Sequence, residues 1–405
     1  MAWPLLSRLA AFHRMTLVRP CRVVVVIGSL GKTTTRRAVE AALGLPSSDM
    51  GSGNAWSSVA LAMLRTGPSG RRIAVEVGIE EVGQMDRYVP VLRPNVVVVT
   101  CIGTEHHRSL GTAETTRHEK AQMVRALRPS GLAVLNGDDP NVLWMAGQTA
   151  ARVLTFGFGR GCDVRASHLT FDWPAGMRFR LHADGHRRDV RVRLFGRQMC
   201  YPILAAVGVA LAEGIALDAA LERLEMLPPT SGRMEPVPLA GGAYLLRDDF
   251  KSTYETIVAS LDALAQVPAR RRIAVLGEVS EPPGPQGPVY REIGAQLAAV
   301  ADRAIIIGHN YQRYAAGAVR AGMSRKALID AGTSPWQAVE ELRRDLGPGD
   351  VVLIKGRDNQ RLERVALALE GRDVRCRLVR CRLRFGRCSE CSALERGHSY
   401  VPFWS

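Results

Sequence analysis

The sequence predicts an α/β protein made of two units, each built around a mostly parallel sheet. Continuous apolar segments such as 23–27 and 96–102 alternate with helix-compatible segments such as 113–127, which is typical of parallel strands covered on both faces. This alternation stops at Pro228 and Pro229 and then restarts. A chain of 405 residues is also long enough for two or three domains of about 100–200 residues each.

The elements of the first unit follow from the spacing of its apolar residues. Short continuous apolar runs favour buried strands, and the longer segments between them favour helices. Between 153 and 194, arginine alternates with apolar residues, which predicts antiparallel strands with one exposed face. The predicted order is strand 23–27, helix 36–43, strands 73–77 and 96–102, helix 113–127, strand 132–135, the antiparallel segment and helix 203–213.

The second unit repeats the alternation after residue 229. Its predicted elements are strand 244–246, helix 256–265, strand 272–276, helix 291–301, strand 304–307, helix 335–346 and strand 351–354. We therefore expect four regions along the chain: an amphipathic helical segment at 1–20 that docks on the first domain, a first domain at 21–228, a second at 229–370, and a basic, cysteine-rich tail at 371–405.

The composition narrows the classes of function. A net charge of +15 suits an anionic substrate, but no basic stripe with interleaved aromatic residues appears, so no nucleic acid partner is expected. No apolar run reaches the roughly 20 residues of a membrane span, and 1–20 lacks the uninterrupted apolar core of a secretory signal. Eight cysteines without such a signal predict a reducing, cytoplasmic location.

A glycine-rich turn directly after the first strand predicts a triphosphate site. Backbone N–H groups of such a turn and of the following helix point at phosphate oxygens, and glycines let the backbone approach closely. Lys32 would neutralise phosphate charge, and the Thr33 hydroxyl can ligate Mg²⁺. The turn, which is shorter than the common phosphate-binding pattern, consists of Gly28, Ser29, Leu30, Gly31, Lys32, Thr33 and Thr34.

Three further polar residues lie in or after the strands of the first unit. Glu76 stands within an apolar strand, where a carboxylate is costly unless a cation such as Mg²⁺ pairs with it. His106 follows the next strand in a loop, and Lys120 lies in the predicted helix after that loop. Taken alone, the last two are compatible with ordinary solvated residues.

Taken together, the turn and several later segments resemble the Mur ligase superfamily, the ATP-dependent acid–amine ligases and their folylpolyglutamate synthetase relatives. The matching segments are 28–34, 75–78, 102–106, 110–111, 118–120 and 135–139. The resemblance implies a central ATPase domain with a phosphate loop, in which Thr33 and Glu76 hold one Mg²⁺ and His106 a second. It also implies that Lys120 carries a carbamate that supports the metal and that Asn136 lies near the nucleotide.

The second half of the chain extends the resemblance through the segments 231–235, 275–278 and 349–356. These are similar to the Rossmann-like C-terminal domain of the same ligases, which closes over ATP. The resemblance implies that Arg233 contacts phosphate and that Asp249, or its neighbour Asp248, contacts the ribose or phosphate side of the nucleotide. ATP and Mg²⁺ are the cofactors that it implies.

The subfamily that this chain resembles most adds D-alanyl-D-alanine to UDP-N-acetylmuramoyl-tripeptide, although 196–198 and 249–254 depart from its pattern. Its members begin with a UDP-binding domain, whereas here the phosphate loop lies within thirty residues of Met1. We therefore expect ATP-dependent ligation, through an acyl phosphate, of a small-molecule amino acid or dipeptide to an acid not linked to UDP, unless a partner protein supplies the substrate. Two alternatives stay open: the D-alanyl-D-alanine ligase itself and a non-catalytic, ATP-binding subunit.

The tail at 371–405 lies outside the resemblance. It carries eight arginines and four cysteines but only three acidic residues. Cysteine thiolates can hold tetrahedral Zn²⁺, which would stabilise a segment too short for its own core, although the upstream spacing is wider than in a common zinc knuckle. Zinc binding and free thiols are equal alternatives for Cys376, Cys381, Cys388 and Cys391.

Overall fold

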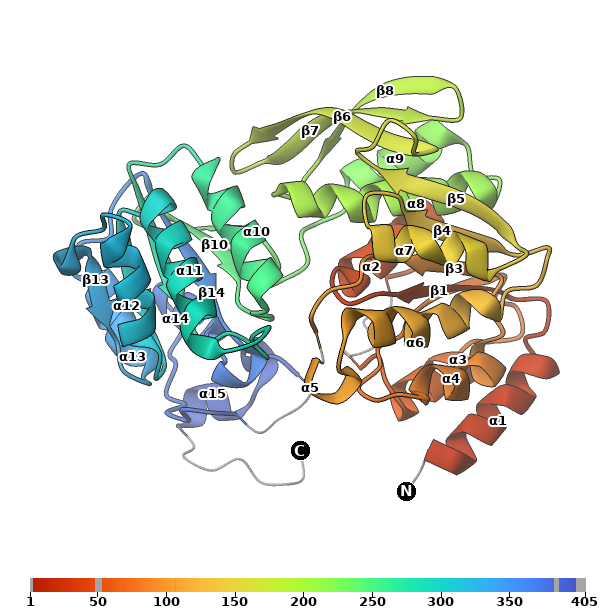
Figure 1. The fold of residues 1–405 in the computed structure, drawn as a ribbon, viewed down its shortest axis with the longest axis horizontal. Helices are drawn as coiled ribbons and strands as arrows, with labels where there is room; N and C mark the ends of the chain where they lie inside the picture. Colours follow the sequence, from red (N-terminus) through yellow and green to blue (C-terminus); the bar gives the residue numbers. More distant parts are fainter. Residues whose placement is uncertain (1–2, 48–52, 106, 382–385, 398–405) are drawn as a thin grey trace. The chain divides into compact units, whose positions relative to one another are not determined.

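The computed structural model describes residues 3–47, 53–105, 107–381 and 386–397. The chain forms two compact units, which Figure 1 shows coloured along the sequence. Each unit is a mostly parallel sheet covered by helices, so the predicted α/β class is confirmed. One unit comprises Met1–Thr170, Met177–Arg193 and Arg197–Pro228, and the other comprises Phe171–Gly176, Leu194–Gly196 and Pro229–Ser405.

The sheet of the first unit has the strand order β2-β1-β3-β4-β5-β6-β7-β8. Neighbours from β2 to β6 pair in parallel, whereas β7 and β8 form an antiparallel hairpin whose turn holds Asp184 and Gly185, both with positive φ. The antiparallel prediction for 153–194 is thus confirmed for this hairpin and wrong for the β5–β6 pair. The strands are β1 (Arg22–Ile27), β2 (Arg72–Glu76), β3 (Val96–Val99), β4 (Leu132–Asn136), β5 (Arg152–Gly157), β6 (Val164–Asp172), β7 (Gly176–Ala183) and β8 (His186–Val192).

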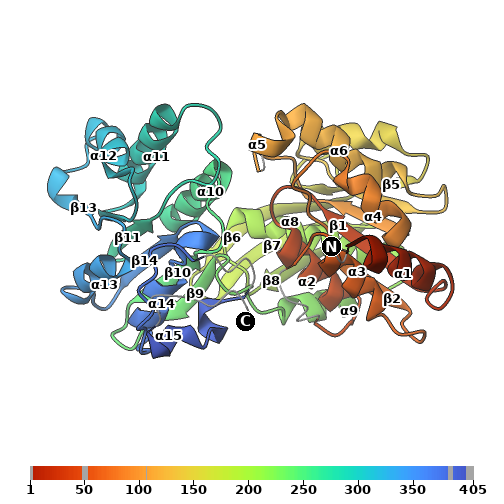
Figure 2. The same cartoon turned by 90° about the horizontal axis from the view of Figure 1, so that it is seen from below.

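Helices cover both faces of this sheet. Figures 1 and 2 show α2, α8 and α9 packed together on one face and α3, α4 and α6 on the other. Strand β1 is buried between these layers, with Val23, Val25 and Ile27 in the same hydrophobic cluster as residues of α3, α4 and α6. The helices are α1 (Trp3–Met15), α2 (Lys32–Ala42), α3 (Ser57–Leu64), α4 (Gln84–Leu92), α5 (His107–Leu110), α6 (Ala113–Arg125), α7 (Pro140–Leu143), α8 (Cys200–Ala212) and α9 (Leu217–Glu225).

The helix predicted near the N-terminus is present as α1, which contacts α3 and α4. Its docked face holds Ala10 and a buried Arg14, whose Nε donates to the carbonyl oxygen of Leu92 at 3.0 Å, at the end of α4. The apolar residues Leu5 and Phe12 are exposed on α1. Within the ranges that the structure describes, no helix is long and apolar enough to cross a membrane.

The second unit has a sheet with the strand order β13-β12-β11-β14-β10-β9. All pairs are parallel except that of β9 with β10, and β9 is an edge strand, where its Pro236 and Pro238 are tolerated. The strands are β9 (Glu235–Pro238), β10 (Tyr244–Asp248), β11 (Arg271–Leu276), β12 (Arg303–Ile306), β13 (Leu328–Asp330) and β14 (Asp350–Lys355). The helices are α10 (Tyr254–Ala265), α11 (Gln286–Val300), α12 (Tyr311–Arg320), α13 (Pro335–Arg343), α14 (Glu363–Leu369) and α15 (Ala393–Arg396).

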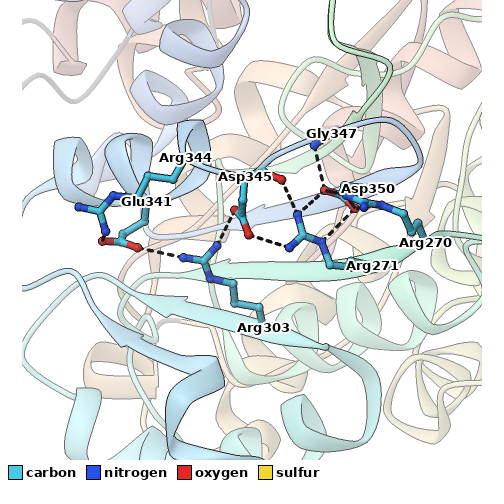
Figure 3. Close-up of polar contacts among 8 residues, drawn as sticks. All are labelled: Arg270, Arg271, Arg303, Glu341, Arg344, Asp345, Gly347 and Asp350. Carbon is cyan, nitrogen blue, oxygen red and sulfur yellow. Dashed lines mark hydrogen bonds and ion pairs between the residues drawn. The ribbon is translucent and has the colours of Figure 1, made fainter.

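An ion-pair network joins the amino ends of three of these strands (Figure 3). The fully buried carboxylate of Asp350 accepts hydrogen bonds from Arg270 and Arg271, and Arg271 and Arg303 both pair with Asp345. Burial alone would raise the pKa of Asp350, but the hydrogen bonds from Arg271 and Arg270 hold it at about 2. This carboxylate is therefore a structural anion that fastens β11 to β14.

The described part of the tail is packed into the second unit. Val374, Cys388 and Leu394 belong to the same hydrophobic cluster as Val365 and other residues of α14. The buried guanidinium of Arg364 also donates to the backbone oxygen of Cys376 at 3.3 Å. The tail thus shares a core with the C-terminal domain.

Candidate active site

The predicted phosphate loop is formed by the end of β1 and the start of α2. Gly31 precedes α2 in the left-handed conformation (φ +79°), and Gly28 has a φ of +139°. A Cβ on Gly28 would lie 1.9 Å from Thr100 Oγ1, so a larger residue does not fit beside the end of β3. The first N–H groups of a helix lack intrahelical partners and carry the positive end of its dipole, so the start of α2 favours an anion.

The other loop residues lie at the same turn. Ser29 donates its backbone N–H to Cys101 O at 2.7 Å, which ties the loop to the segment after β3. Thr33 is half-buried and Thr34 is buried in the first turn of α2. The structure therefore brings the predicted loop residues together at one helix start, while their contacts with a nucleotide remain a prediction.

Two buried lysines converge on one backbone oxygen of this loop. Lys32 Nζ donates to Gly28 O at 3.0 Å and to Ser29 O at 2.8 Å, and Lys120 Nζ donates to the same Gly28 O at 3.1 Å. Burial, followed by the charge of Lys32, lowers the pKa of Lys120 to about 7. Two ammonium groups that share an acceptor in a buried place form an electrostatically unfavourable pair, which an anion at the loop would relieve.

Sequence reasoning assigned no role to Glu105, although this residue belongs to the site. Its buried carboxylate lies 3.6 Å from Lys32 Nζ. The signal in the sequence is its position in the polar segment directly after the third strand. The pairing holds the Lys32 ammonium group at the loop.

Glu76 and Asn136 lie at the carboxyl ends of β2 and β4, the edge where β1 meets the loop. Glu76 Oε1 accepts from Asn54 Nδ2 at 2.7 Å. Asn136 Nδ2 donates to Thr100 O at 2.8 Å, and Thr100 Oγ1 in turn donates to Leu30 O at 2.6 Å. Asn136 therefore supports the phosphate loop through Thr100.

The predicted magnesium ligands are only partly described. His106 lies outside the described residues, and among the residues that are described no group of three or more His, Cys, Asp or Glu side chains is placed to hold a metal ion. Mg²⁺ usually keeps several waters and takes one or two carboxylates together with substrate phosphates. A hydroxyl from Thr33 and a carboxylate from Glu76, at one sheet edge beside a phosphate loop, fit such a partial set of ligands.

In the second unit, the predicted phosphate contact Arg233 lies in a turn before β9. Its N–H donates to Thr230 O at 3.0 Å, and its guanidinium carbon lies 4.7 Å from the centre of the Phe250 ring. Stacking on an aromatic ring orients a guanidinium while leaving its edge able to bind an oxyanion.

Both candidate aspartates of the second unit are buried and paired. Asp249 accepts from Arg247 Nε at 3.1 Å, and burial raises its pKa to about 6 although Arg247 opposes the shift. Asp248 accepts from the buried Lys355 and from Ser260. Lys355 was likewise given no role from sequence. The roles predicted for these aspartates toward a nucleotide stay predictions.

The four tail cysteines line one small cavity, but the predicted Zn²⁺ is not supported. They are free thiols, and within the described ranges no metal-holding group was found. Arg364 donates instead to Cys376 Sγ at 3.7 Å.

Two protein families match this chain. The Mur ligase middle domain matches residues 26–210, and the Mur ligase, glutamate ligase domain matches residues 232–357. The UDP-N-acetylmuramoyl-tripeptide–D-alanyl-D-alanine ligase of Mycobacterium tuberculosis is 32% identical over 381 residues, which are 88% of this chain and 74% of that protein. The Escherichia coli ligase of the same name is 27% identical over 75% of this chain and 67% of its own length.

Solved structures show the same fold. The MurF ligase of Thermotoga maritima in complex with ADP has a TM-score of 0.79 at 21% identity and covers 91% of this chain and 84% of its own. The folylpolyglutamate synthase of Mycobacterium tuberculosis, complexed with ADP and AMPPCP, has a TM-score of 0.66 at 18% identity, covering 91% of this chain and 96% of its own.

Proposed function

This chain belongs to the Mur ligase family of ATP-dependent ligases that form C–N bonds, and from that premise we propose that it joins a D-alanyl-D-alanine-type dipeptide to a muramoyl peptide acid. The observation that carries the proposal is the similarity to ligases of this name across 88% of the chain, through both matched domains. This similarity favours the alternative that the chain is a D-alanyl-D-alanine ligase over the expectation that it ligates an acid not linked to UDP.

The loop of the first unit supports the first chemical step. A carboxylate is a poor electrophile, so its oxygen must attack the γ-phosphorus of ATP and release ADP, which gives an acyl phosphate. Lys32 would neutralise the charge that spreads over the transferred phosphoryl group, and the N–H groups at the start of α2 would bind its oxygens. The amine nitrogen then attacks the acyl carbon, phosphate leaves and the nitrogen loses a proton.

Mg²⁺, bound with the nucleotide, would supply further neutralisation of phosphate charge, with Thr33 and Glu76 as ligands of one ion and His106 as the predicted ligand of a second. Lys120 supports a separate role. With a pKa of about 7, much of this amine is neutral near physiological pH, and the neutral form reacts with carbon dioxide to give a carbamate. A carbamate would replace the repulsion from Lys32 by attraction.

The non-catalytic alternative is disfavoured by the same residues. The carbamate proposed for Lys120 would serve turnover and not nucleotide binding alone, so a buried Lys120 beside Lys32 favours a catalytic chain. A cytoplasmic location and a partner protein stay predictions.

A competition assay tests the proposed acid. The purified chain is offered ATP, Mg²⁺ and D-alanyl-D-alanine with equal concentrations of UDP-N-acetylmuramoyl-tripeptide and of the same muramoyl tripeptide without UDP, and both products are measured by mass spectrometry. We expect ligation of a muramoyl tripeptide with one ADP released per bond, and a preference for the UDP-linked acid. Equal or faster ligation of the acid without UDP would favour the expectation from sequence that the acid is not linked to UDP. Release of ADP without a ligated product from either acid would contradict the proposed ligase activity.

A further inference from the structure

The tail of the second unit reaches the turn that holds Arg233. Arg387 Nη2 donates to Ser231 O at 2.5 Å, and its guanidinium carbon lies 5.8 Å from the centre of the Phe250 ring. A Cβ built on Gly232 would lie 3.5 Å from Arg387 Nη1. A residue 154 positions away in sequence from Arg233 thus contacts the same turn and the same ring (387 − 233).

The backbone on both sides of Arg387 is fixed to the core of the unit. Arg361 Nη1 donates to Gly386 O at 2.8 Å, and the N–H of Cys388 donates to the buried carboxylate of Glu363 at 2.8 Å. Both partners belong to or directly precede α14. Because its neighbours are held, Arg387 is placed at the turn before any ligand binds, which lowers the entropy lost on binding.

Positive charge gathers at this ring. Arg233 and Arg387 are both stacked on Phe250, at 4.7 and 5.8 Å from its centre. The adjacent carboxylate of Asp249 accepts from Arg247 and also feels the charge of Arg387, and the carboxylate of Glu235 accepts from the N–H of Gly232. Each of these guanidinium groups has forked donors of the kind that bind oxyanions.

We propose that Arg387 and Arg233 form a two-arginine oxyanion site on Phe250, and that the tail is therefore part of the ligand-binding machinery. Arg387 lies outside the matched glutamate ligase domain, which ends at residue 357. The identity of the oxyanion rests on the proposed function: it is a phosphate group of the nucleotide or the carboxylate of the acid substrate. Both are oxyanions that a guanidinium pair binds in the same way.

Substitutions in the full-length chain test this site. Arg387→Ala removes the guanidinium, and Arg387→Lys keeps a point charge without the fork. Arg377→Ala is the matched control, because Arg377 is also a tail arginine stacked on a ring, 4.2 Å from the centre of Trp336. The affinity for AMP-PNP with Mg²⁺ is measured by calorimetry at two salt concentrations, and the KM for the acid is measured in the ligation assay.

For a nucleotide phosphate, we expect Arg387→Ala to weaken AMP-PNP binding about tenfold and to reduce its salt dependence, with Arg387→Lys in between and Arg377→Ala unchanged. If the oxyanion is the carboxylate of the acid substrate, we expect Arg387→Ala to keep a normal affinity for AMP-PNP and to raise the KM for the acid about tenfold. Melting temperatures identify any variant that has lost its fold. If Arg387→Ala does not fold, the same two measurements are made on Arg387→Lys.

Normal nucleotide affinity together with a normal KM in a folded variant would overturn the oxyanion site. Its failure is distinguishable from that of the proposed function, because nucleotide binding is measured without turnover. A wild-type chain that ligates no acid, while Arg387→Ala still loses AMP-PNP affinity, would reject the ligase proposal and support the site.

Discussion

Two clusters of buried charge in this molecule are built in opposite ways. At the amino ends of β11 and β14, Arg270 and Arg271 both pair with the buried carboxylate of Asp350, and the pKa of Asp350 is held at about 2 (Figure 3). At the phosphate loop, two lysines share the carbonyl oxygen of Gly28, and the pKa of Lys120 falls to about 7.

The difference separates structural charge from functional charge. The arginine network completes its own pairing and needs no ligand, so it stabilises the fold. At the loop, Glu105 lies 3.6 Å from Lys32 Nζ, yet burial and the charge of Lys32 still lower the pKa of Lys120. An anion bound at the loop would favour the charged form of Lys120, and shifted pKa values of this kind are typical of functional sites. The contrast therefore predicts that damage to the first cluster costs stability and that damage to the second costs activity.

The largest effect that we expect is on the ligation rate, when Lys120 of the lysine pair is replaced. Lys120→Ala removes the amine that would carry the carbamate, and we expect the ligation rate to fall at least about a hundredfold. Short carboxylates such as acetate, added to this variant, should restore part of the rate because they can occupy the vacated space as anions. Normal turnover by Lys120→Ala would remove the catalytic role from this lysine.

Asp350→Asn tests whether the arginine network stabilises the fold. Removing this buried anion leaves Arg270 and Arg271 without their shared partner, and we expect the free energy of unfolding in urea to fall by about 3 kcal/mol. The matched control is Asp345→Asn at a carboxylate whose side chain is 45% exposed, where a loss of about 1 kcal/mol or less is expected. Folded Asp350→Asn should still bind nucleotide; equal losses in the two variants would contradict the contrast.

A smaller effect is the pH dependence that Lys120 gives to stability. Its pKa is about 7 in the folded chain and near 10.5 when unfolded, so between these values the unfolded state binds more protons. The free energy of unfolding should therefore rise with pH from about 7 to 10 through this group, the penalty being complete below pH 7. Lys120→Met should lose this part of the rise in buffer free of carbon dioxide, and identical slopes for the two proteins would place the Lys120 pKa at its ordinary value.

The fold could be predicted from sequence where one signal dominated. Continuous apolar runs predicted β1, β3 and β4, because a strand buried on both faces needs no alternation of apolar and polar residues. Short edge elements such as β9 and β13 were not predicted, since Pro236 argues against a strand and three residues carry no period. The parallel β5–β6 pair was mistaken for antiparallel because the alternation of arginine with apolar residues, which is clearest in β7 and β8, was extended to the whole segment.

The site could be predicted to the level of its loop and not to that of its contacts. Glycines followed by Lys32 identify a phosphate loop by local chemistry alone. The shared oxygen of Gly28 and the reach of Arg387 to Ser231 depend on residues that are distant in sequence, so only the folded chain shows them. The tail cysteines illustrate the reverse case, where the sequence left zinc and free thiols as equal alternatives and the described residues show free thiols without a metal-holding group.

Lys32→Ala gives the most direct test that the disfavoured lysine pair is the site of ATP chemistry. Melting temperature with and without Mg²⁺ and AMP-PNP is measured for the wild-type chain and this variant, alongside ATP-dependent ligation. We expect the variant to lose both the nucleotide-induced rise and the ligation. Its unliganded melting temperature reflects two opposing changes, because one of two repelling ammonium groups is gone while the buried carboxylate of Glu105 loses its partner. An unliganded variant that melts normally, is stabilised by AMP-PNP as much as the wild type and still ligates would contradict the assignment.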